Sequence, residues 1–415
     1  MTEILSPRRA RCRWRRVLLV GAALLLGVGI VVAIGLFQHF KPYWQANTGF
    51  GEEALTVRVP LGTSGAQLAA VLSAQGALAD SAAFHRYLRQ RGLETRSYSG
   101  QYRVVRGSST RAIVNQIAGR RQLPVQLVVT STRTTGEWAR RVASQLAIDS
   151  AALNDCMRDS LFLASLGFTP RALPSMVIPN TYEVYWDIAP EQLLARLARE
   201  HDAYWSDTRR ALAAQIPLTP LEISTLASII QEEVVHPSEL PMVAGVYINR
   251  LRRGMHLQAC PTAKYAAGNM ALTRVLKAHT QIASPYNTYI HPGLPPGPII
   301  YPSMQALEAV LHYAHHDYLY FCAKADFSGY HHFSRTGLEH MRYAEEYHRA
   351  LTRQGHRGGV SSGCWWLCAR GISGWPSGCW PLGRCRRRRP RRSSARRAAR
   401  ARRCFPRCRR RRWGW

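Results

Sequence analysis

A run of 21 residues without a charge, residues 17–37, most constrains what this chain can fold into. As an α-helix, a run of this length crosses the roughly 30 Å hydrocarbon layer of a membrane. Tyr43 and Trp44 follow it, at the level where aromatic rings anchor in the far interface. Basic clusters stay on the cytoplasmic side, and one precedes the run: Arg8, Arg9, Arg11, Arg13, Arg15 and Arg16.

These features predict three segments: a basic cytoplasmic tail over residues 1–16, a transmembrane helix over residues 17–37, and an extracytoplasmic part after Lys41. A cleaved signal peptide is the alternative. Its apolar core would be shorter, about 7–15 residues, and would end in a small-residue cleavage site that is not evident here. The sequence therefore favours an uncleaved anchor.

The net charge of +31 is concentrated at the end of the chain. Residues 357–415 contain 19 arginines, no lysine and no acidic residue, which leaves a net charge of +12 for the rest. That remainder is basic enough to work near anionic lipid or an anionic wall polymer. The total charge therefore does not by itself indicate a nucleic-acid-binding protein.

Residues 357–415 are rich in Arg, Gly, Cys, Ala, Pro and Trp, and three interpretations compete. The segment could bind nucleic acid through arginine and aromatic stacking. It could bind metal through its cysteines, although the pairs Cys364/Cys368 and Cys404/Cys408 have no histidine among them. The third and favoured interpretation is a disordered or frameshift-derived tail, because GC-rich codons give these residues in the wrong frame. Nucleic acid is therefore not an expected partner.

The body of the chain predicts neither a disulfide framework nor a metal site. Its three cysteines, Cys156, Cys260 and Cys322, are scattered. The spacing of His312, His315 and His316 fits one face of a helix, but no carboxylate or cysteine accompanies them as a zinc signature. No metal and no cofactor are expected.

Residues 226–233 read as an amphipathic helix that carries a carboxylate on its apolar side. At 3.6 residues per turn, Glu233 lies on the same face as Leu226, Ile229 and Ile230, whereas Glu232 is rotated by about 100° and can reach water. Burial beside aliphatic side chains should raise the pKa of Glu233, which suits a general acid. The alternative is a helix-edge glutamate paired with a nearby arginine.

Further motifs follow this helix in a fixed order. They are N-R-L at 249–251, G-M-H-L-Q at 254–258, P-T at 261–262, S-P-Y-N-T-Y at 284–289, G-L-P-P-G-P-I at 293–299 and H-H-F at 331–333. Together with L-A-S-I-I-Q-E-E at 226–233, they resemble the MltG-type (YceG-like) endolytic murein transglycosylases. The resemblance covers roughly residues 50–353.

The resemblance implies an α+β fold in which two parts follow the transmembrane helix already predicted from the apolar run: a LysM-like α/β subdomain over residues 50–123 and a mixed α+β catalytic domain over residues 125–353. In the subdomain, the pattern predicts a strand at 55–59, a turn at 60–63 and a helix through Leu68 and Leu72. It then predicts a helix at 82–91 capped near Ser81, a strand around Val104, and a helix capped by Ser108 or Ser109 and closed by Gly119.

In the catalytic part the pattern predicts a strand at 125–129, helices at 135–146 and 192–208, and a helix with Pro220 in its first turn. Two positions depart from the family pattern. Asn180 stands where relatives usually have Asp, so no acid role is assigned to it. Cys260 replaces the Asp of the usual L-Q-x-D-P-T, which puts any chemical role of that Asp in doubt.

The resemblance assigns the catalytic role to Glu233, as the acid and then the base of a lytic transglycosylase. The chain offers no convincing second carboxylate near Glu233, whereas ordinary glycosidases use two. Roles in binding substrate are expected for a second set: Gln258, Thr262, Tyr286, Asn287, Thr288, Tyr289 and His332.

The predicted anchor and the family resemblance together imply a single-pass inner-membrane lyase with its catalytic part in the periplasm. It would cut MurNAc–GlcNAc bonds of nascent peptidoglycan strands, leave 1,6-anhydroMurNAc ends and stop strand elongation, with peptidoglycan synthases as partners. The main alternative is a catalytically weak glycan-binding or scaffold protein of the same fold. A two-carboxylate hydrolase, which would leave reducing ends, and a membrane-anchored nucleic-acid binder are further alternatives.

Overall fold

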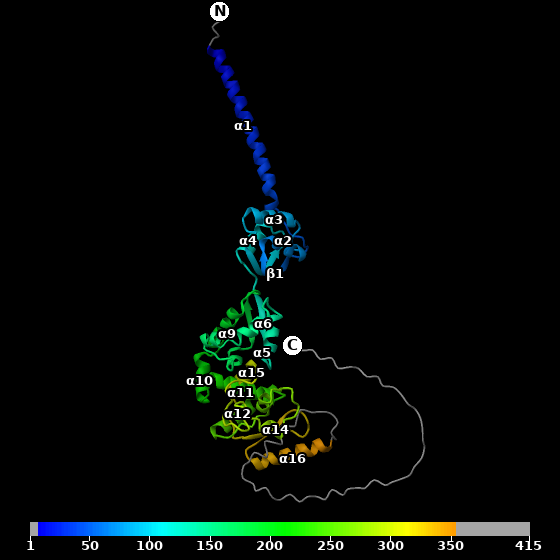
Figure 1. Cartoon of the computed structure of the whole chain (residues 1–415), viewed down its shortest axis with the longest axis vertical. Coiled ribbons are helices and arrows are strands. Elements are labelled where there is room, and N and C mark those ends of the chain that lie inside the picture. The colour runs from blue at the N-terminus through cyan, green and yellow to red at the C-terminus, as the bar shows by residue number, and fades with distance from the viewer. Residues whose placement is uncertain (1–6, 354–415) are drawn as a thin grey trace, which may run out of the picture. The chain divides into compact units, whose positions relative to one another are not determined.

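The structure, a computed structural model, describes residues 7–353 (Figure 1). Residues 1–6 and the arginine-rich tail at 357–415 lie outside the described residues, so the interpretations of that tail stay predictions. The described chain mixes helices with three two-stranded antiparallel sheets. The expected α+β fold with an N-terminal apolar helix is therefore confirmed.

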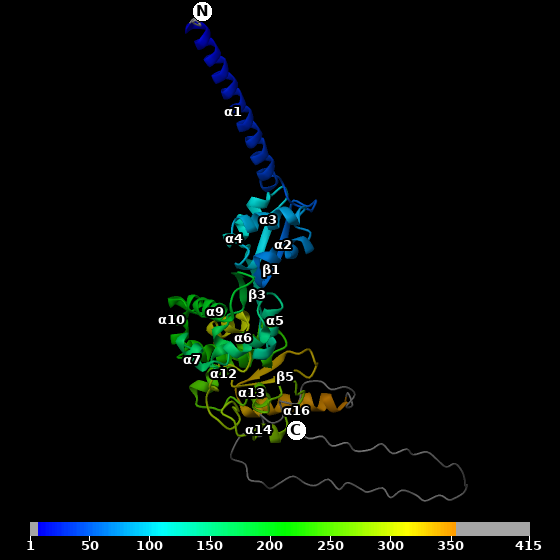
Figure 2. The same cartoon turned by 45° about the horizontal axis from the view of Figure 1, so that its top comes forward.

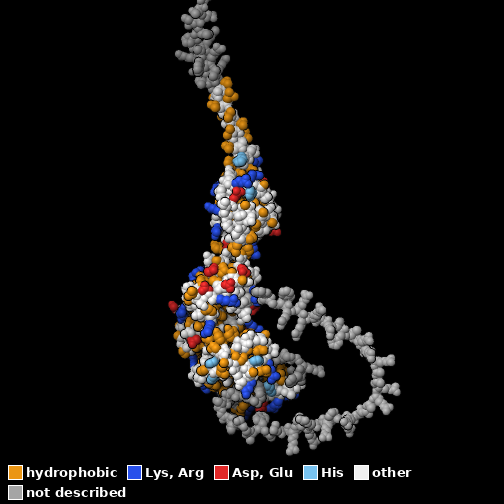
Figure 3. Space-filling model, viewed as in Figure 1, with side chains coloured by type: hydrophobic (Ala, Val, Ile, Leu, Met, Phe, Trp, Pro, Cys, Tyr) orange, Lys and Arg blue, Asp and Glu red, His pale blue; other side chains and the backbone are white. Residues whose placement is uncertain are grey.

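Helix α1 (Pro7–Trp44) contains the apolar run. Its part from Leu19 to Trp44 has 26 residues and a mean hydropathy of 2.7 in its most apolar window. At 1.5 Å per residue this part is about 39 Å long, which exceeds the hydrocarbon thickness of a bilayer. Apolar side chains line its exposed surface (Figure 3). Helix α1 is thus long and apolar enough to cross a membrane.

The segment after α1 has the predicted order of strand, two helices, strand and helix. The elements are β1 (Ala54–Ser64), α2 (Gly65–Ala74), α3 (Ser81–Gln90), β2 (Ser97–Val105) and α4 (Thr110–Ala118). Their inward faces share one buried cluster, which includes Val57, Leu68, Phe84, Tyr102 and Ile113. The likeness of this segment to LysM modules and its domain boundaries stay predictions.

Two local predictions in this segment were wrong. Residues 60–63 do not form a separate turn, because β1 continues through them with a shift in register between Val59 and Thr63. The cap of α3 is Asp80, whose carboxylate accepts the N–H of Ala83 at 2.8 Å, and Ser81 is the first helical residue. The predictions of Ser109 as the N-cap and Gly119 as the C-cap of α4 are confirmed.

The remaining described chain, residues 125–353, carries two larger clusters of buried side chains. The first gathers around β3 (Val125–Val129), which pairs with β4 (Asn180–Val184). It also includes residues from the following helices: α5 (Thr135–Ala143), α6 (Ser150–Cys156), α7 (Ser160–Ser165), α8 (Leu173–Met176) and α9 (Pro190–Tyr204).

The second cluster surrounds α11 (Pro220–Glu233), whose eight consecutive residues from Ile223 to Ile230 are all buried. Around it lie α10 (Asp207–Gln215), α12 (Leu240–Arg252), α15 (Met304–Leu311) and the pair of β5 (Tyr320–Ala323) with β6 (His331–Ser334). Three short elements and one long helix complete this part: η1 (Pro237–Glu239), α13 (Cys260–Ala266), α14 (Lys277–Thr280) and the long α16 (Gly337–Arg353) (Figure 2).

Helix ends were the least accurate predictions in this part. The helix expected at 135–146 ends at Ala143, and the helix expected at 192–208 is α9 followed by the start of α10. Helix α15 ends at Leu311, so His312, His315 and His316 do not share a helix face. Within residues 7–353, no group of three potential ligands is arranged to hold a metal ion.

Candidate active site

Glu233 is the last residue of α11, and the local sequence explains why the helix spans these residues. Thr219 and Glu222 form a capping box at its start, with Pro220 at the first helical position. At its end Val234 turns to an extended conformation, so the Glu233 side chain leaves the helix at the margin of the buried cluster. Glu233 is half-buried there.

The carboxylate of Glu233 is held by Tyr247 of α12. The Tyr247 hydroxyl donates a hydrogen bond to Oε1 of Glu233 at 3.1 Å. The ring of Tyr247 is itself buried and meets Phe321 of β5 edge to face, with centroids 5.7 Å apart. Tyr247 therefore has little freedom, and its hydroxyl fixes one oxygen of the carboxylate.

Glu233 opens on a small pocket of about 10 Å³, roughly the space of one water molecule. Glu233 is the only acidic residue among the described side chains that line it. The lining combines apolar groups with polar ones: Tyr247, Arg250, Leu257, Gln258, Cys260, Phe321 and His340.

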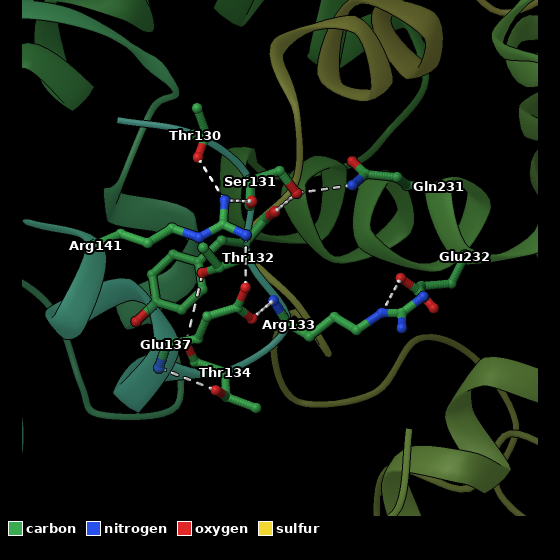
Figure 4. A network of polar contacts seen from close by, with 10 residues as sticks. Thr130, Ser131, Thr132, Arg133, Thr134, Glu137, Arg141, Gln231 and Glu232 are labelled. Carbon is green, nitrogen blue, oxygen red and sulfur yellow. Dashed lines mark hydrogen bonds and ion pairs between the residues drawn. The ribbon is translucent and has the colours of Figure 1, made fainter. Parts of the chain in front are cut away.

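Glu232, the preceding residue, was expected to reach water, and that expectation was wrong. Its side chain is only 12% exposed and forms an ion pair with Arg133, with Nε 3.0 Å from Oε1 (Figure 4). Arg133 reaches Glu232 because the segment after β3 passes beside the end of α11 (Figure 4).

Gln231 fixes the same turn of α11 from another side. Its amide nitrogen donates to the Ser131 hydroxyl at 2.8 Å (Figure 4), and its amide oxygen accepts the N–H of Ser303 at 2.6 Å. Ser131 in turn donates to the carbonyl of Tyr301. Three segments far apart in the sequence therefore meet at the turn that carries Glu233.

Gln258 reaches the pocket from a loop in a strained conformation. Its φ of +47° lies in the left-handed region, which side-chain-bearing residues rarely adopt. The loop is held by Thr288, whose carbonyl accepts the N–H of Gln258 and whose hydroxyl accepts the N–H of Ala259. The structure thus brings Gln258 to Glu233, as the sequence had suggested.

Thr262, Asn287 and Thr288 are buried, and their polar groups bond to the chain itself. The hydroxyls of Thr262 and Thr288 lie 2.8 Å apart. The amide of Asn287 donates to the carbonyls of Thr280 and Ile282. These bonds give the three residues a structural role in the loops beside the pocket, and their contact with substrate stays a prediction.

The two tyrosines of the Y-N-T-Y motif are partly buried. The hydroxyl of Tyr289 lies 3.0 Å from the sulfur of Cys260, so the cysteine that replaces the usual Asp contacts this motif. Tyr286 packs against Tyr265 with ring centroids 4.6 Å apart, and burial raises the pKa of Tyr286 to about 12. Tyr286 is therefore a neutral hydrogen-bonding group at physiological pH.

His332 does not line the Glu233 pocket; its ring stacks on Tyr343 of α16, with centroids 4.2 Å apart. Its neighbour His331 is buried and bound to Glu239, with Nδ1 2.7 Å from Oε2. The backbone N–H of His331 donates to the other oxygen of Glu239. This pair fastens β6 to the start of α12.

The sequence had assigned no role to Tyr247, Leu257 and Phe321 of the pocket, nor to its two basic side chains, Arg250 and His340. Arg250 is buried and donates to the carbonyls of Leu319 and Leu257, so its charge is held beside Glu233. His340 is 2% exposed, and neither ring nitrogen has a hydrogen-bond partner among the described residues. Burial, with the nearby charge of Arg250, lowers the pKa of His340 to about 4.

The signal for these two residues was weak in the sequence. Arg250 stands in the N-R-L motif, which was noted without assigning a role to the arginine. His340 lies in α16, far along the chain from Glu233, in a helix whose other residues are mostly charged or exposed. Only the packing of α16 against β5 brings it to the pocket.

The fold and this site define a mixed α+β protein with an N-terminal apolar helix and a single carboxylate in a small, partly apolar pocket. The sequence model described as the YceG-like family matches residues 57–346. Because this match covers more than half of the sequence, the chain belongs to the YceG-like family.

Curated relatives agree with this family. The chain is 27% identical over 329 residues to a Bacillus subtilis (strain 168) protein named endolytic murein transglycosylase, with 75% of this chain and 90% of that protein covered. A Streptococcus pneumoniae (serotype 2, strain D39) protein of the same name is 33% identical over 155 residues, and the match covers 36% of this chain but only 28% of that protein.

Among solved structures, a crystal structure of a YceG-like protein from Listeria monocytogenes resembles the chain. The sequences are 27% identical, and the match covers 70% of this chain and 99% of the other. The TM-score is 0.47.

Proposed function

We propose that this chain is an endolytic murein transglycosylase, a lyase that cuts MurNAc–GlcNAc bonds within peptidoglycan glycan strands. The observation that carries the proposal is the single carboxylate of Glu233 in its pocket, held by Tyr247. Its relatives named endolytic murein transglycosylase support it. A hydrolase would need a second carboxylate close by, and Glu232 and Glu239 are bound to Arg133 and His331.

In the proposed reaction, Glu233 first gives its proton to the oxygen that links MurNAc to GlcNAc. The bond breaks, GlcNAc leaves with that proton, and positive charge develops on the anomeric carbon of MurNAc. Glu233, now a carboxylate, removes the proton of the 6-hydroxyl of the same sugar, whose oxygen closes on the anomeric carbon. The product is a 1,6-anhydroMurNAc end, no water is consumed, and Glu233 is protonated again.

Two physical effects support one residue in both roles. General acid–base transfer of this kind contributes roughly 10²–10⁴-fold in rate. The intramolecular hydroxyl adds the advantage of a nucleophile already in place. The raised pKa of Glu233 stays a prediction.

We keep all of the predicted residues as proposed substrate contacts, but the structure places them at different distances from the Glu233 pocket. Gln258 lines the pocket, and Tyr286 and Tyr289 offer hydroxyl groups on the adjacent loop. Thr262, Asn287 and Thr288 hold that loop in shape, in addition to any contact with sugar. His340 and Arg250 join the set as pocket groups, whereas His332 would act only at a distance from Glu233.

The proposed location is the inner membrane, with α1 as a single-pass anchor, residues 1–16 in the cytoplasm and the catalytic part in the periplasm. The length and hydropathy of α1 support an anchor. Near the membrane, the enzyme would act on nascent strands and stop their elongation, with peptidoglycan synthases as partners.

A second candidate is a glycan-binding or scaffold protein of the same fold with weak catalysis. The observation that favours it is the size of the Glu233 pocket, about 10 Å³, which does not hold a sugar ring without opening. The Cys260 contact with Tyr289 favours it too, because a thiol stands where relatives usually carry a carboxylate.

The test is mass spectrometry of peptidoglycan incubated with the purified full-length protein, beside its Glu233→Gln variant and a control variant, Glu345→Gln, whose side chain is exposed on α16. We expect internal fragments with 1,6-anhydroMurNAc ends from the wild type and from Glu345→Gln. Glu233→Gln should lower their rate of formation by roughly 10²–10⁴-fold. Binding of strands without any cleavage by the wild type would favour the scaffold.

A further inference from the structure

A second hollow, of about 510 Å³, lies between β4 and α9, and none of its lining residues belongs to the Glu233 pocket. Val184 and Ile188 give it apolar walls. Around them stand Tyr185, Gln192, Arg196 and Arg199. The volume lies within the range of small-molecule sites, about 300–1,000 Å³, and the mixture of apolar walls with a few polar groups is typical of them.

The sequence of α9 explains why its polar residues face the hollow together. Leu193, Leu194 and Leu197 are buried in the cluster around β3. Gln192, Ala195, Arg196 and Arg199 have the spacing i, i+3, i+4 and i+7, which places them in one stripe along the helix. The stripe is adjacent to the buried face, so it borders β4 instead of pointing straight into solvent.

The charged side chains of the hollow differ in their hydrogen-bond and ion-pair partners. Arg196 donates through Nε to Glu200 at 2.7 Å, which fixes its guanidinium and leaves its terminal nitrogens for other acceptors. Arg199 is exposed and forms no ion pair among the described residues. The one acid of the lining, Glu183, accepts a hydrogen bond from Gln126 at 2.7 Å.

These groups match the chemistry of a sugar that carries a carboxylate. Tyr185 is 53% exposed, so its ring offers an amphipathic face against which the apolar face of a pyranose can pack. The guanidinium of Arg199 has a planar fork of donors, which binds a carboxylate through two parallel hydrogen bonds. Two cations beside an acid are too few for a nucleic-acid backbone, which is bound by many phosphate contacts.

We propose that the hollow between β4 and α9 is a second binding site for an anionic glycan, separate from the Glu233 pocket. Its ligand is a stretch of peptidoglycan strand away from the bond that is cut, with a sugar on Tyr185 and a lactyl or stem-peptide carboxylate on Arg199 and Arg196. The identity of this ligand rests on the proposed function.

With two binding sites on one protein, the affinity for a glycan strand depends on the length of that strand. A strand that occupies both sites gains affinity because its second contact is intramolecular, whereas a fragment that fills only one site gains nothing. The hollow therefore makes the protein prefer long strands over short ones without altering the chemistry at Glu233.

The test uses the full-length protein in detergent with Glu233→Gln as the parent, so that bound strands stay intact. Binding of long uncross-linked strands and of a tetrasaccharide is compared for the parent, for Tyr185→Ala with Arg199→Ala, and for Arg158→Ala as control. Arg158 is an exposed arginine of the same part of the chain, 77% exposed, and does not line the hollow. Melting temperatures verify folding, and Arg199→Glu replaces the double variant if that variant melts early.

We expect the double variant to bind long strands about tenfold more weakly, with the tetrasaccharide and the control unchanged. The affinity for neutral chitin strands of similar length should fall less when Arg199 is replaced. Long-strand binding equal to the parent, or an equal loss in Arg158→Ala, would overturn the proposal. If the wild type cuts neither substrate but the double variant still binds long strands more weakly, the second binding site is supported and the transglycosylase proposal is contradicted. If the wild type cuts strands normally and the double variant binds them as the parent does, the transglycosylase proposal is supported and the second site is contradicted.

Discussion

At the scale of single residues, Glu233 depends on neighbours that come from distant parts of the sequence. Tyr247 binds its carboxylate, while Gln231 and Glu232 fix the helix turn through Ser131, Ser303 and Arg133. Their effect is to hold the side chain in one orientation, which the role proposed for Glu233, to give and then take a proton, requires.

His340 makes stability depend on pH in a defined direction. Its pKa is lowered from 6.5 to about 4 by burial and by Arg250, so the unfolded chain binds the proton more tightly than the folded one. The stability is full above the unfolded pKa and is lost as the pH falls from 6.5 towards 4. Between pH 7.5 and pH 5 the loss from this group is roughly 2 kcal/mol.

This loss is measurable by urea unfolding of the wild type and of His340→Gln at both pH values. His201 and His348, whose pKa values burial also lowers, contribute equally to both proteins and cancel in the comparison. We expect the variant to lose less stability than the wild type on acidification. Identical losses in the two proteins would show that His340 does not stay neutral in the folded chain.

At the scale of elements, the pair of Glu239 and His331 joins the β5–β6 hairpin to the start of α12. Both side chains are more than 90% buried, and Glu239 accepts from both the ring and the backbone of His331. The same hairpin carries Phe321, which packs on Tyr247. The pair therefore supports the wall of the Glu233 pocket.

Glu239→Ala should cost about 3–5 kcal/mol in the free energy of unfolding, because it removes the buried carboxylate that both the ring and the backbone N–H of His331 contact. Glu345→Ala is the matched control: it removes an exposed ion pair with Arg349 from α16 and should cost less than about 1 kcal/mol. Chemical denaturation of the three proteins gives both numbers. A cost for Glu239→Ala as small as that of the control would contradict the role of the pair.

The helices and loops show which features of the fold could be predicted from the sequence. Local signals predicted the caps Ser109 and Gly119 and the start of α11 at Pro220, because each depends on a few adjacent residues. Asp80 was missed because Asp and Ser both cap helices and stand side by side there. The loop of Gln258 could not be derived, since Thr288 holds it from another segment, and the same holds for His340 in the pocket.

At the scale of the whole molecule, the proposed membrane anchor and the proposed periplasmic enzyme together predict on which side of the membrane residues 50–353 lie. If α1 spans the inner membrane with its basic end in the cytoplasm, protease added to spheroplasts should digest residues 50–353, and alkaline carbonate should not extract the protein. Removal of residues 1–38 should release the protein from the membrane fraction. Protection of residues 50–353 in intact spheroplasts would contradict the proposed orientation.

The central claim is that Glu233 cuts the strand without adding water. The most direct measurement is digestion of peptidoglycan by the full-length protein in water labelled with heavy oxygen, followed by mass spectrometry of the new strand ends. The account predicts 1,6-anhydroMurNAc ends that carry no label, because the 6-hydroxyl of the sugar is the nucleophile. Reducing ends that carry one labelled oxygen would contradict it, since water would then have attacked the anomeric carbon.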